Sequence, residues 1–241
     1  MRPGAAVRAV IHRHPSPNCG PRRQGARPDL IVLHYTGMQS FAAARDRLCD
    51  PASEVSAHYL ITERGGILHL VKEEMRAWHA GAGQWGGVSD VNSRSIGLEL
   101  VNTGAHPFPE PQMAALEGLL RGIMDRWIIP PERVIAHSDV APQRKSDPGP
   151  RFDWRRLAIR GLSVWPQGHT AKLAAETVGG FADDARKFGY ALGDLAPLED
   201  VLRAFRLRFR PAASGPLDDV DCRLIADLAR RFPVDRADTS A

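Results

Sequence analysis

The sequence has few cysteines and no long apolar run. Its 241 residues include three cysteines, Cys19, Cys49 and Cys222, which lie far apart and form no CxxC pair. An odd number of scattered cysteines argues against a disulfide framework and against a cysteine-based metal site. Such cysteine usage fits a reducing compartment best. No apolar stretch approaches the roughly 20 residues of a membrane-spanning helix, so no membrane span is expected.

The beginning of the sequence also lacks the apolar segment of an export signal. Residues 1–27 are rich in arginine and proline and are expected to form an extended lead-in. Read from this start, the sequence predicts a cytoplasmic protein. The alternative is a periplasmic protein whose export signal is missing from this start site. The net charge of only +4 is compatible with acidic substrates but does not require nucleic acid.

Apolar periodicity predicts the main elements. Strands are predicted from short apolar or alternating runs at 30–33, 59–62, 67–71, 95–101 and 134–136. Helical spacing predicts helices at about 40–49 and 111–127. After residue 168 no strand-like run follows, and three short helical patterns appear between 176 and 233. We therefore predict a catalytic domain over 28–168 and a small three-helix domain over 169–235.

Three segments end in residues of metal-ligand type. His34 and His137 each end a predicted strand, and Asp147 follows in the stretch from Lys145 to Asp147. Two neutral imidazoles and one carboxylate are a usual catalytic zinc set, which leaves one position for water. Taken singly, each residue has a simpler interpretation. A histidine at the end of a strand is commonly hydrogen-bonded in the core or at its rim, and an aspartate before a proline is commonly a turn residue.

Glu99 and Lys145 add to this pattern. Glu99 lies in a strongly apolar strand, opposite in face to Ile96, Leu98 and Leu100. A buried carboxylate is costly unless it has a partner or a task. The proline after Asp147 favours extended backbone there, so Lys145 and Asp147 are expected to project to the same face.

Five motifs occur together in one order. They are IVLHY at 31–35, VSAHYLI at 55–61, AWHAG at 77–81, NSRSIGLEL at 92–100 and AHSDVAPQRKSDPGP at 136–150. This set resembles the N-acetylmuramoyl-L-alanine amidases of the second amidase family, of the AmpD and AmiD type. The resemblance covers roughly residues 28–166. It implies an α/β fold in which helices flank a central mixed β-sheet.

The resemblance also implies an activity and a set of site residues. The expected reaction is zinc-dependent cleavage of the amide bond between N-acetylmuramic acid, in its 1,6-anhydro form, and L-alanine. The substrates would be muropeptides, the peptidoglycan fragments of cell-wall recycling or turnover. By motif, His34, His137 and Asp147 match the zinc ligands. Glu99 matches the general base, and Lys145 matches the group that stabilises the developing oxyanion.

Several aromatic and histidine residues lie in the same motifs. Tyr35 and Trp78 are candidates to line the sugar–peptide groove, although Trp78 is equally well interpreted as a core residue. His58, His69 and His79 are expected to be structural rather than ligands.

The C-terminal residues 176–233 resemble a three-helix peptidoglycan-binding module, with Arg206 where a glutamine is usual. The alternative is a basic nucleic-acid-binding helix, because four arginines cluster between 203 and 210. Phe205 and Phe209 fall at core spacing and aspartates follow at 218–221, so no nucleic acid partner is expected.

The main alternative for the whole chain is a peptidoglycan-recognition protein of the same fold that binds without cutting. Such relatives typically lack a metal ligand. This sequence retains the two histidines, the aspartate, Glu99 and Lys145, which favours the enzyme.

Overall fold

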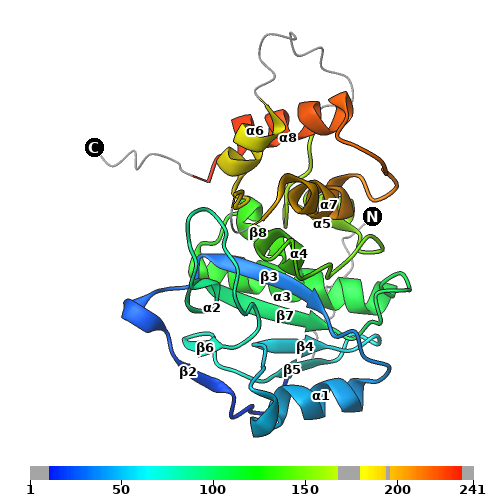
Figure 1. Ribbon diagram of the computed structural model, residues 1–241. Coiled ribbons are helices and arrows are strands. Elements are labelled where there is room, and N and C mark those ends of the chain that lie inside the picture. The colour runs from blue at the N-terminus through cyan, green and yellow to red at the C-terminus, as the bar shows by residue number, and fades with distance from the viewer. Residues whose placement is uncertain (1–10, 168–179, 194–195, 235–241) are drawn as a thin grey trace.

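The computed structural model describes residues 11–167, 180–193 and 196–234. Residues 1–10 of the predicted lead-in and 168–179 at the predicted domain boundary lie outside these ranges. At the centre is a six-stranded mixed sheet, shown in Figure 1. Its strands, in spatial order, are β1 (Ile11–Arg13), β5 (Ile67–His69), β4 (Tyr59–Ile61), β7 (Ser95–Leu100), β3 (Leu30–Tyr35) and β8 (Val134–Ala136).

The strands at one end of this sheet are parallel. β3 lies between β7 and β8 and runs parallel to both, and β4 runs parallel to β7. β4 and β5, which the sequence predicts as two neighbouring strands, pair as an antiparallel hairpin. A separate two-stranded sheet pairs β2 (Cys19–Pro21) with β6 (Met75–Ala77). The predicted mixed sheet is confirmed, and the carboxyl ends of β3, β7 and β8 meet at one edge.

Helices surround the sheet. They are α1 (Phe41–Cys49), α2 (Val91–Arg94), α3 (Glu110–Trp127), α4 (His137–Val140), α5 (Trp154–Ile159), α6 (Phe181–Phe188), α7 (Leu198–Phe209) and α8 (Asp219–Arg231). Among the described helices, none combines the length and the apolar character that crossing a bilayer requires.

One face of the sheet packs against α3, which runs behind β3 and β7 in Figure 1. The alternating residues Ile96, Leu98 and Leu100 of β7 are fully buried there, as the sequence pattern predicts. They contact the apolar stripe of α3, which includes Leu116 and Leu120. Burying each such side chain contributes about 1.5–3 kcal/mol to folding.

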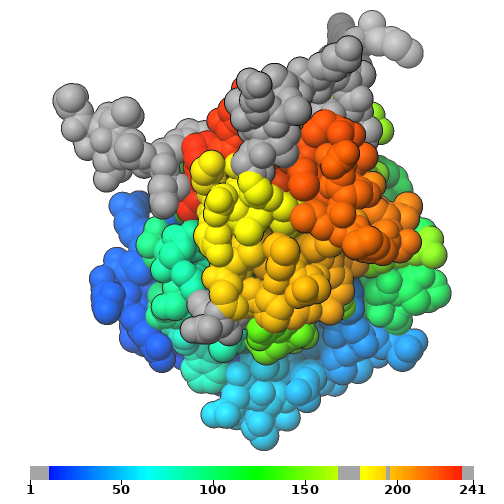
Figure 2. Space-filling model, turned by 45° about the horizontal axis from the view of Figure 1, so that its top comes forward, coloured from blue at the N-terminus to red at the C-terminus, as the bar shows by residue number. Residues whose placement is uncertain are grey.

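The C-terminal helices cover part of the opposite face. Leu30 and Val32 of β3 belong to the same buried cluster as Phe188 of α6, Phe205 of α7 and Leu228 of α8. In Figure 2 the part of the chain that contains these helices, coloured yellow to red, lies against the blue-to-green part that precedes it. The division into 28–168 and 169–235 stays a prediction, but the two parts share one hydrophobic core.

The lead-in is more structured than the sequence indicates. Residues 11–27 contribute the edge strand β1 and the strand β2, neither of which has an apolar pattern of its own. Arg22, just after β2, ties this segment to the rest of the fold. Its guanidinium donates to the carbonyl oxygens of Glu73, Ser93 and Ser95, at 2.6, 2.8 and 3.0 Å. These strands depend on distant partners, which explains why local periodicity misses them.

A buried carboxylate joins the loop after β5 to the end of α3. Glu73 accepts hydrogen bonds from Tyr59 Oη at 2.7 Å, Arg126 Nη2 at 2.6 Å and Trp127 Nε1 at 2.6 Å. Burial alone would raise the pKa of Glu73, but these donors outweigh it and hold the pKa below its ordinary value.

We predict that Glu73→Gln lowers the free energy of unfolding at pH 7 by about 1.5–3 kcal/mol, the range for hydrogen bonds to charged groups. A carboxyl whose folded pKa is lowered stabilises the protein above its unfolded pKa of about 4.3, and this contribution is lost as the pH falls through the folded pKa. Glutamine does not titrate, so the difference in free energy of unfolding between the wild type and Glu73→Gln should narrow below about pH 4. Urea unfolding at several pH values measures this, and a gap that stays constant down to pH 3 contradicts it.

Candidate active site

The ends of two parallel strands place the first two site residues. His34 of β3 and Glu99 of β7 are register partners. Because side chains alternate along a strand, His34 shares a face with Leu30 and Val32. The C-terminal helices pack over Leu30 and Val32, whereas His34 lines a cleft of about 420 Å³.

Two further predicted residues join His34. His137 is the first residue of α4 and follows β8 directly. The backbone N–H of Ser138 donates to the carbonyl oxygen of Asp147 at 3.0 Å, which ties the two segments together. His34 Nδ1 lies 2.9 Å from His137 Nδ1, and each of these atoms lies 3.0 Å from Asp147 Oδ2. The structure therefore brings the three predicted ligands together, and all three are buried.

A chain of hydrogen bonds fixes where the proton of His34 lies. Ser95 Oγ is 2.6 Å from the carbonyl oxygen of Val91, so its hydroxyl donates there. Ser95 Oγ then accepts from His79 Nε2, 3.1 Å away, which leaves His79 Nδ1 as an acceptor. His79 Nδ1 receives the N–H of His34 Nε2 at 3.0 Å. His34 Nδ1 consequently carries a bare lone pair that faces His137 and Asp147.

His137 is oriented in the same sense. Its Nε2 lies 3.0 Å from the carbonyl oxygen of Ala80, which only accepts, so Nε2 carries the proton, and in the neutral ring Nδ1 is then bare. Burial, reinforced by the neighbouring His137, lowers the pKa of His34 to about 4, which keeps its imidazole neutral at pH 7. Two bare nitrogens and a carboxylate oxygen at this spacing repel one another and suit a divalent metal ion.

Glu99 lies in the same cleft, and its Oε2 is fully buried. That atom has no hydrogen-bond partner within the described ranges. Burial, together with the charge of Asp147, raises the pKa of Glu99 to about 8, while Lys145 opposes the rise. A carboxyl without other bonds and with a raised pKa is suited to taking up a proton.

The remaining predicted residues also line this cleft. Lys145 is partly exposed beside Asp147. Tyr35 Oη is within hydrogen-bond distance of Ser146 Oγ, at 3.2 Å. Trp78 is half-buried and lines the cleft, so it is not simply a core residue.

Sequence reasoning missed the role of His79. The sequence predicts a structural role for it but does not show which one: in the structure its Nδ1 accepts from the ring of His34, a predicted ligand. Gly97, on the same face of β7 as Glu99, makes room for it: a Cβ at Gly97 would lie 2.4 Å from His79 Cγ. A glycine inside an apolar strand is the kind of sequence signal that marks such a close approach.

The comparisons with known proteins agree with this geometry. A family model described as N-acetylmuramoyl-L-alanine amidase matches residues 24–150. The chain belongs to this family. It is 36% identical to the N-acetylmuramoyl-L-alanine amidase AmiD of Escherichia coli, over 82% of this chain and 80% of the relative. It is 33% identical to the 1,6-anhydro-N-acetylmuramyl-L-alanine amidase AmpD of E. coli, over 61% of this chain and 90% of the relative.

Solved structures confirm the fold. An E. coli AmiD structure matches with a TM-score of 0.77 and 34% identity, over 88% of this chain and 93% of that one. AmpDh3 of Pseudomonas aeruginosa matches with a TM-score of 0.75 and 32% identity, over 87% and 94%. A match over 88% of the chain includes more residues than the stretch 1–167 contains. The similarity to AmiD therefore extends into the C-terminal helices.

The hydrogen bonds predict that His34 and His137 are both protonated at Nε2 and bare at Nδ1. When Zn²⁺ is added to ¹⁵N-histidine-labelled protein, we expect the Nδ1 resonances of His34 and His137 to shift as these atoms bind the metal. Their Nε2 atoms should stay protonated, because His79 and the Ala80 carbonyl accept from them. Long-range ¹H–¹⁵N spectra measure this. Metal binding through Nε2 of either ring contradicts the predicted hydrogen-bond order.

Proposed function

We propose that this protein hydrolyses the amide bond between N-acetylmuramic acid, in its 1,6-anhydro form, and L-alanine in muropeptides. The observation that carries the proposal is the convergence of two bare Nδ1 atoms and Asp147 Oδ2 beside the carboxyl of Glu99, whose Oε2 has no hydrogen-bond partner among the described residues. Family membership gives the chemistry its substrate class. The AmiD structure holds anhydro-N-acetylmuramic acid-L-Ala-D-γ-Glu-L-Lys as its substrate, and an AmpDh3 structure holds an anhydromuramic pentapeptide.

We infer that the metal ion is zinc and that His34, His137 and Asp147 would hold it. The donor set fits, because three protein ligands of these types leave one position for water or substrate. When bound, zinc supplies Lewis acidity, which polarises a carbonyl group and makes a water acidic enough to lose a proton near pH 7.

Glu99 is placed to move the proton that this hydrolysis requires. Its carboxyl group, which lines the cleft, takes a proton from the attacking water and passes it to the amide nitrogen as the C–N bond breaks. The oxygen of the water stays on the lactyl carbonyl carbon, which becomes a carboxyl group, and L-alanine leaves as an amine. The positive charge of a bound zinc ion would lower the pKa of Glu99 from its raised value, so that the carboxylate form is available near pH 7.

We assign to Lys145 the stabilisation of the charge that develops on the carbonyl oxygen. It lines the cleft, and its charge acts on both Glu99 and His34. It makes no ion pair with the residues described here, so its ammonium is available to substrate. Electrostatic stabilisation of this kind is commonly the largest contribution to acyl-group hydrolysis.

A second cation of the cleft suits the stem peptide. Arg47 of α1 is exposed, lines the cleft and has no carboxylate partner in the described part of the chain. The substrate in the AmiD structure contains a γ-linked glutamate, whose α-carboxylate is not used in the peptide bond. We propose that Arg47 pairs with a carboxylate of the stem peptide.

The alternative function, recognition without cleavage, needs the cleft but not the buried carboxyl. We predict that Glu99→Gln keeps about one zinc per chain but lowers turnover of an anhydro-muropeptide by about 10²–10⁴, the range for loss of a general base. Elemental analysis measures the metal, and chromatography of the released peptide measures turnover.

Asp147→Asn is the matched variant, because it should lose both zinc and activity. A wild-type protein that cleaves at full rate without metal contradicts the zinc centre. A Glu99→Gln protein within tenfold of the wild type excludes Glu99 as the base, and a wild-type protein that binds muropeptide without cleaving it supports the recognition function.

We predict that Arg47→Gln raises KM for the anhydro-muropeptide by about tenfold and leaves kcat unchanged, as expected when a uniform binding contact is lost. Arg45→Gln is the control, because Arg45 lies on the same helix and pairs with Asp46 instead of lining the cleft. Steady-state kinetics of the two variants decide this. Equal KM values in both variants contradict a role for Arg47 in binding the stem peptide.

A further inference from the structure

A fully buried ion pair connects the C-terminal helices to the segment that carries His137. Arg208 of α7 donates from Nη1 to Asp139 Oδ2 at 2.7 Å, and both side chains are 0% exposed. Asp139 lies in α4, two residues after His137. Burying two charges is costly unless their geometry and remaining hydrogen bonds are well satisfied.

Arg208 holds both ends of this segment. Its Nη2 donates to the carbonyl oxygen of Val134 at 3.0 Å, at the start of β8, and to Ser163 Oγ at 3.2 Å. Its guanidinium also lies over the ring of Trp154, 4.4 Å from the centroid. One side chain therefore contacts the first residue of β8 and a residue of α4, and His137 lies between these two points.

Asp139 transmits this hold to the backbone next to His137. Its Oδ2 accepts from the backbone N–H of Ala136 at 2.9 Å, and its Oδ1 accepts from Tyr190 Oη at 2.6 Å. α4 has only four residues, too few to keep a helical turn stable by itself. The turn depends on Asp139, and Asp139 depends on two groups from the C-terminal helices and the loop after α6.

We propose that Arg208 and Tyr190 are positioning residues for the metal centre. Through Asp139 they fix the turn that presents His137 Nδ1 to His34 and Asp147. Because Ser138 N donates to the carbonyl oxygen of Asp147, a tilt of this turn displaces two ligands at once. The proposal rests on the proposed function only in requiring that the metal binds at His137.

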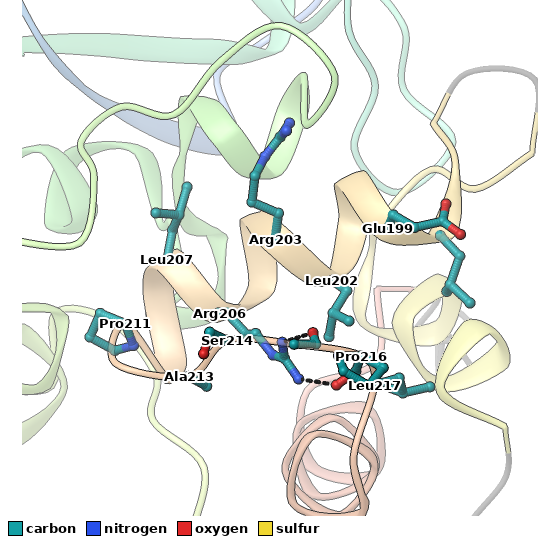
Figure 3. A pocket seen from close by; sticks show the side chains of 12 residues that line it. Glu199, Leu202, Arg203, Arg206, Leu207, Pro211, Ala213, Ser214, Pro216 and Leu217 are labelled. Carbon is teal, nitrogen blue, oxygen red and sulfur yellow. Dashed lines mark hydrogen bonds between the residues drawn. The ribbon is translucent and has the colours of Figure 1, made fainter.

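The same helix contains a matched control. Arg206 is also buried, and its Nε donates to both carboxylate oxygens of Asp221, at 3.2 and 3.1 Å. In Figure 3 it reaches the loop after α7, where it donates to the carbonyl oxygens of Gly215 at 2.6 Å and Pro216 at 2.8 Å. All these partners belong to the C-terminal part, so the loss of Arg206 removes a buried ion pair without touching β8 or α4.

The test compares Arg208→Met, Arg206→Met and Tyr190→Phe in the full chain loaded with zinc. Both arginine variants should lower Tm. Arg208→Met should also weaken zinc affinity by about 10–100-fold, the range for loss of an outer partner of a metal site. It should change the visible spectrum of the Co²⁺-substituted protein, whereas Arg206→Met keeps the wild-type affinity and spectrum. Tyr190→Phe, which loses a single hydrogen bond, should weaken zinc affinity less.

Equal zinc affinity and equal Co²⁺ spectra in the two arginine variants overturn the proposal. If Arg208→Met does not fold, Tyr190→Phe decides, and an unchanged zinc affinity in that variant overturns it. Cleavage by the wild type is measured in parallel. A wild type that binds zinc but does not cleave contradicts the proposed function. The positioning role is then still tested by the zinc affinities of the variants. A wild type that binds no zinc overturns both.

Discussion

Three acceptor atoms without protons face one another in the interior, at 2.9–3.0 Å. Such a cluster is unfavourable without positive charge among its members, because no N–H or O–H lies between them. The surrounding structure keeps the cluster in place by accepting the N–H groups of the two rings on the side away from it. His79 receives the N–H of His34, the Ala80 carbonyl receives that of His137, and the turn after β8 is held from outside the sheet.

The sequence predicts the inner part of this arrangement well. Apolar runs locate β3, β7 and β8, and residues of ligand type at their ends indicate the site. Glu99 stands out as a carboxylate in an apolar strand. The short strands β1, β2 and β6 escape prediction because their own residues form no apolar pattern and distant partners define them. The role of His79 escapes for a related reason, since the direction of its hydrogen bonds depends on Ser95 and Val91.

The arginines of α7 and of its C-cap, Arg210, show how a charge pattern can be misread when burial is unknown. Their spacing suggests a basic face, but each has a carboxylate partner. The pairs are Arg203 with Asp200, Arg206 with Asp221, Arg208 with Asp139, and Arg210 with Asp218 and Asp221. This helix connects parts of the fold and does not present a basic surface. The compartment stays a prediction from sequence, cytoplasmic with a periplasmic alternative.

The strict alternation of β7 links correct folding to chemistry. Glu99 faces the cleft, and its neighbours Leu98 and Leu100 face α3. A slip of one residue in the pairing of β7 would send a leucine into the cleft and a carboxylate into the apolar layer against α3. Such a misfolded chain would lose stability and its reactive carboxyl in the same event.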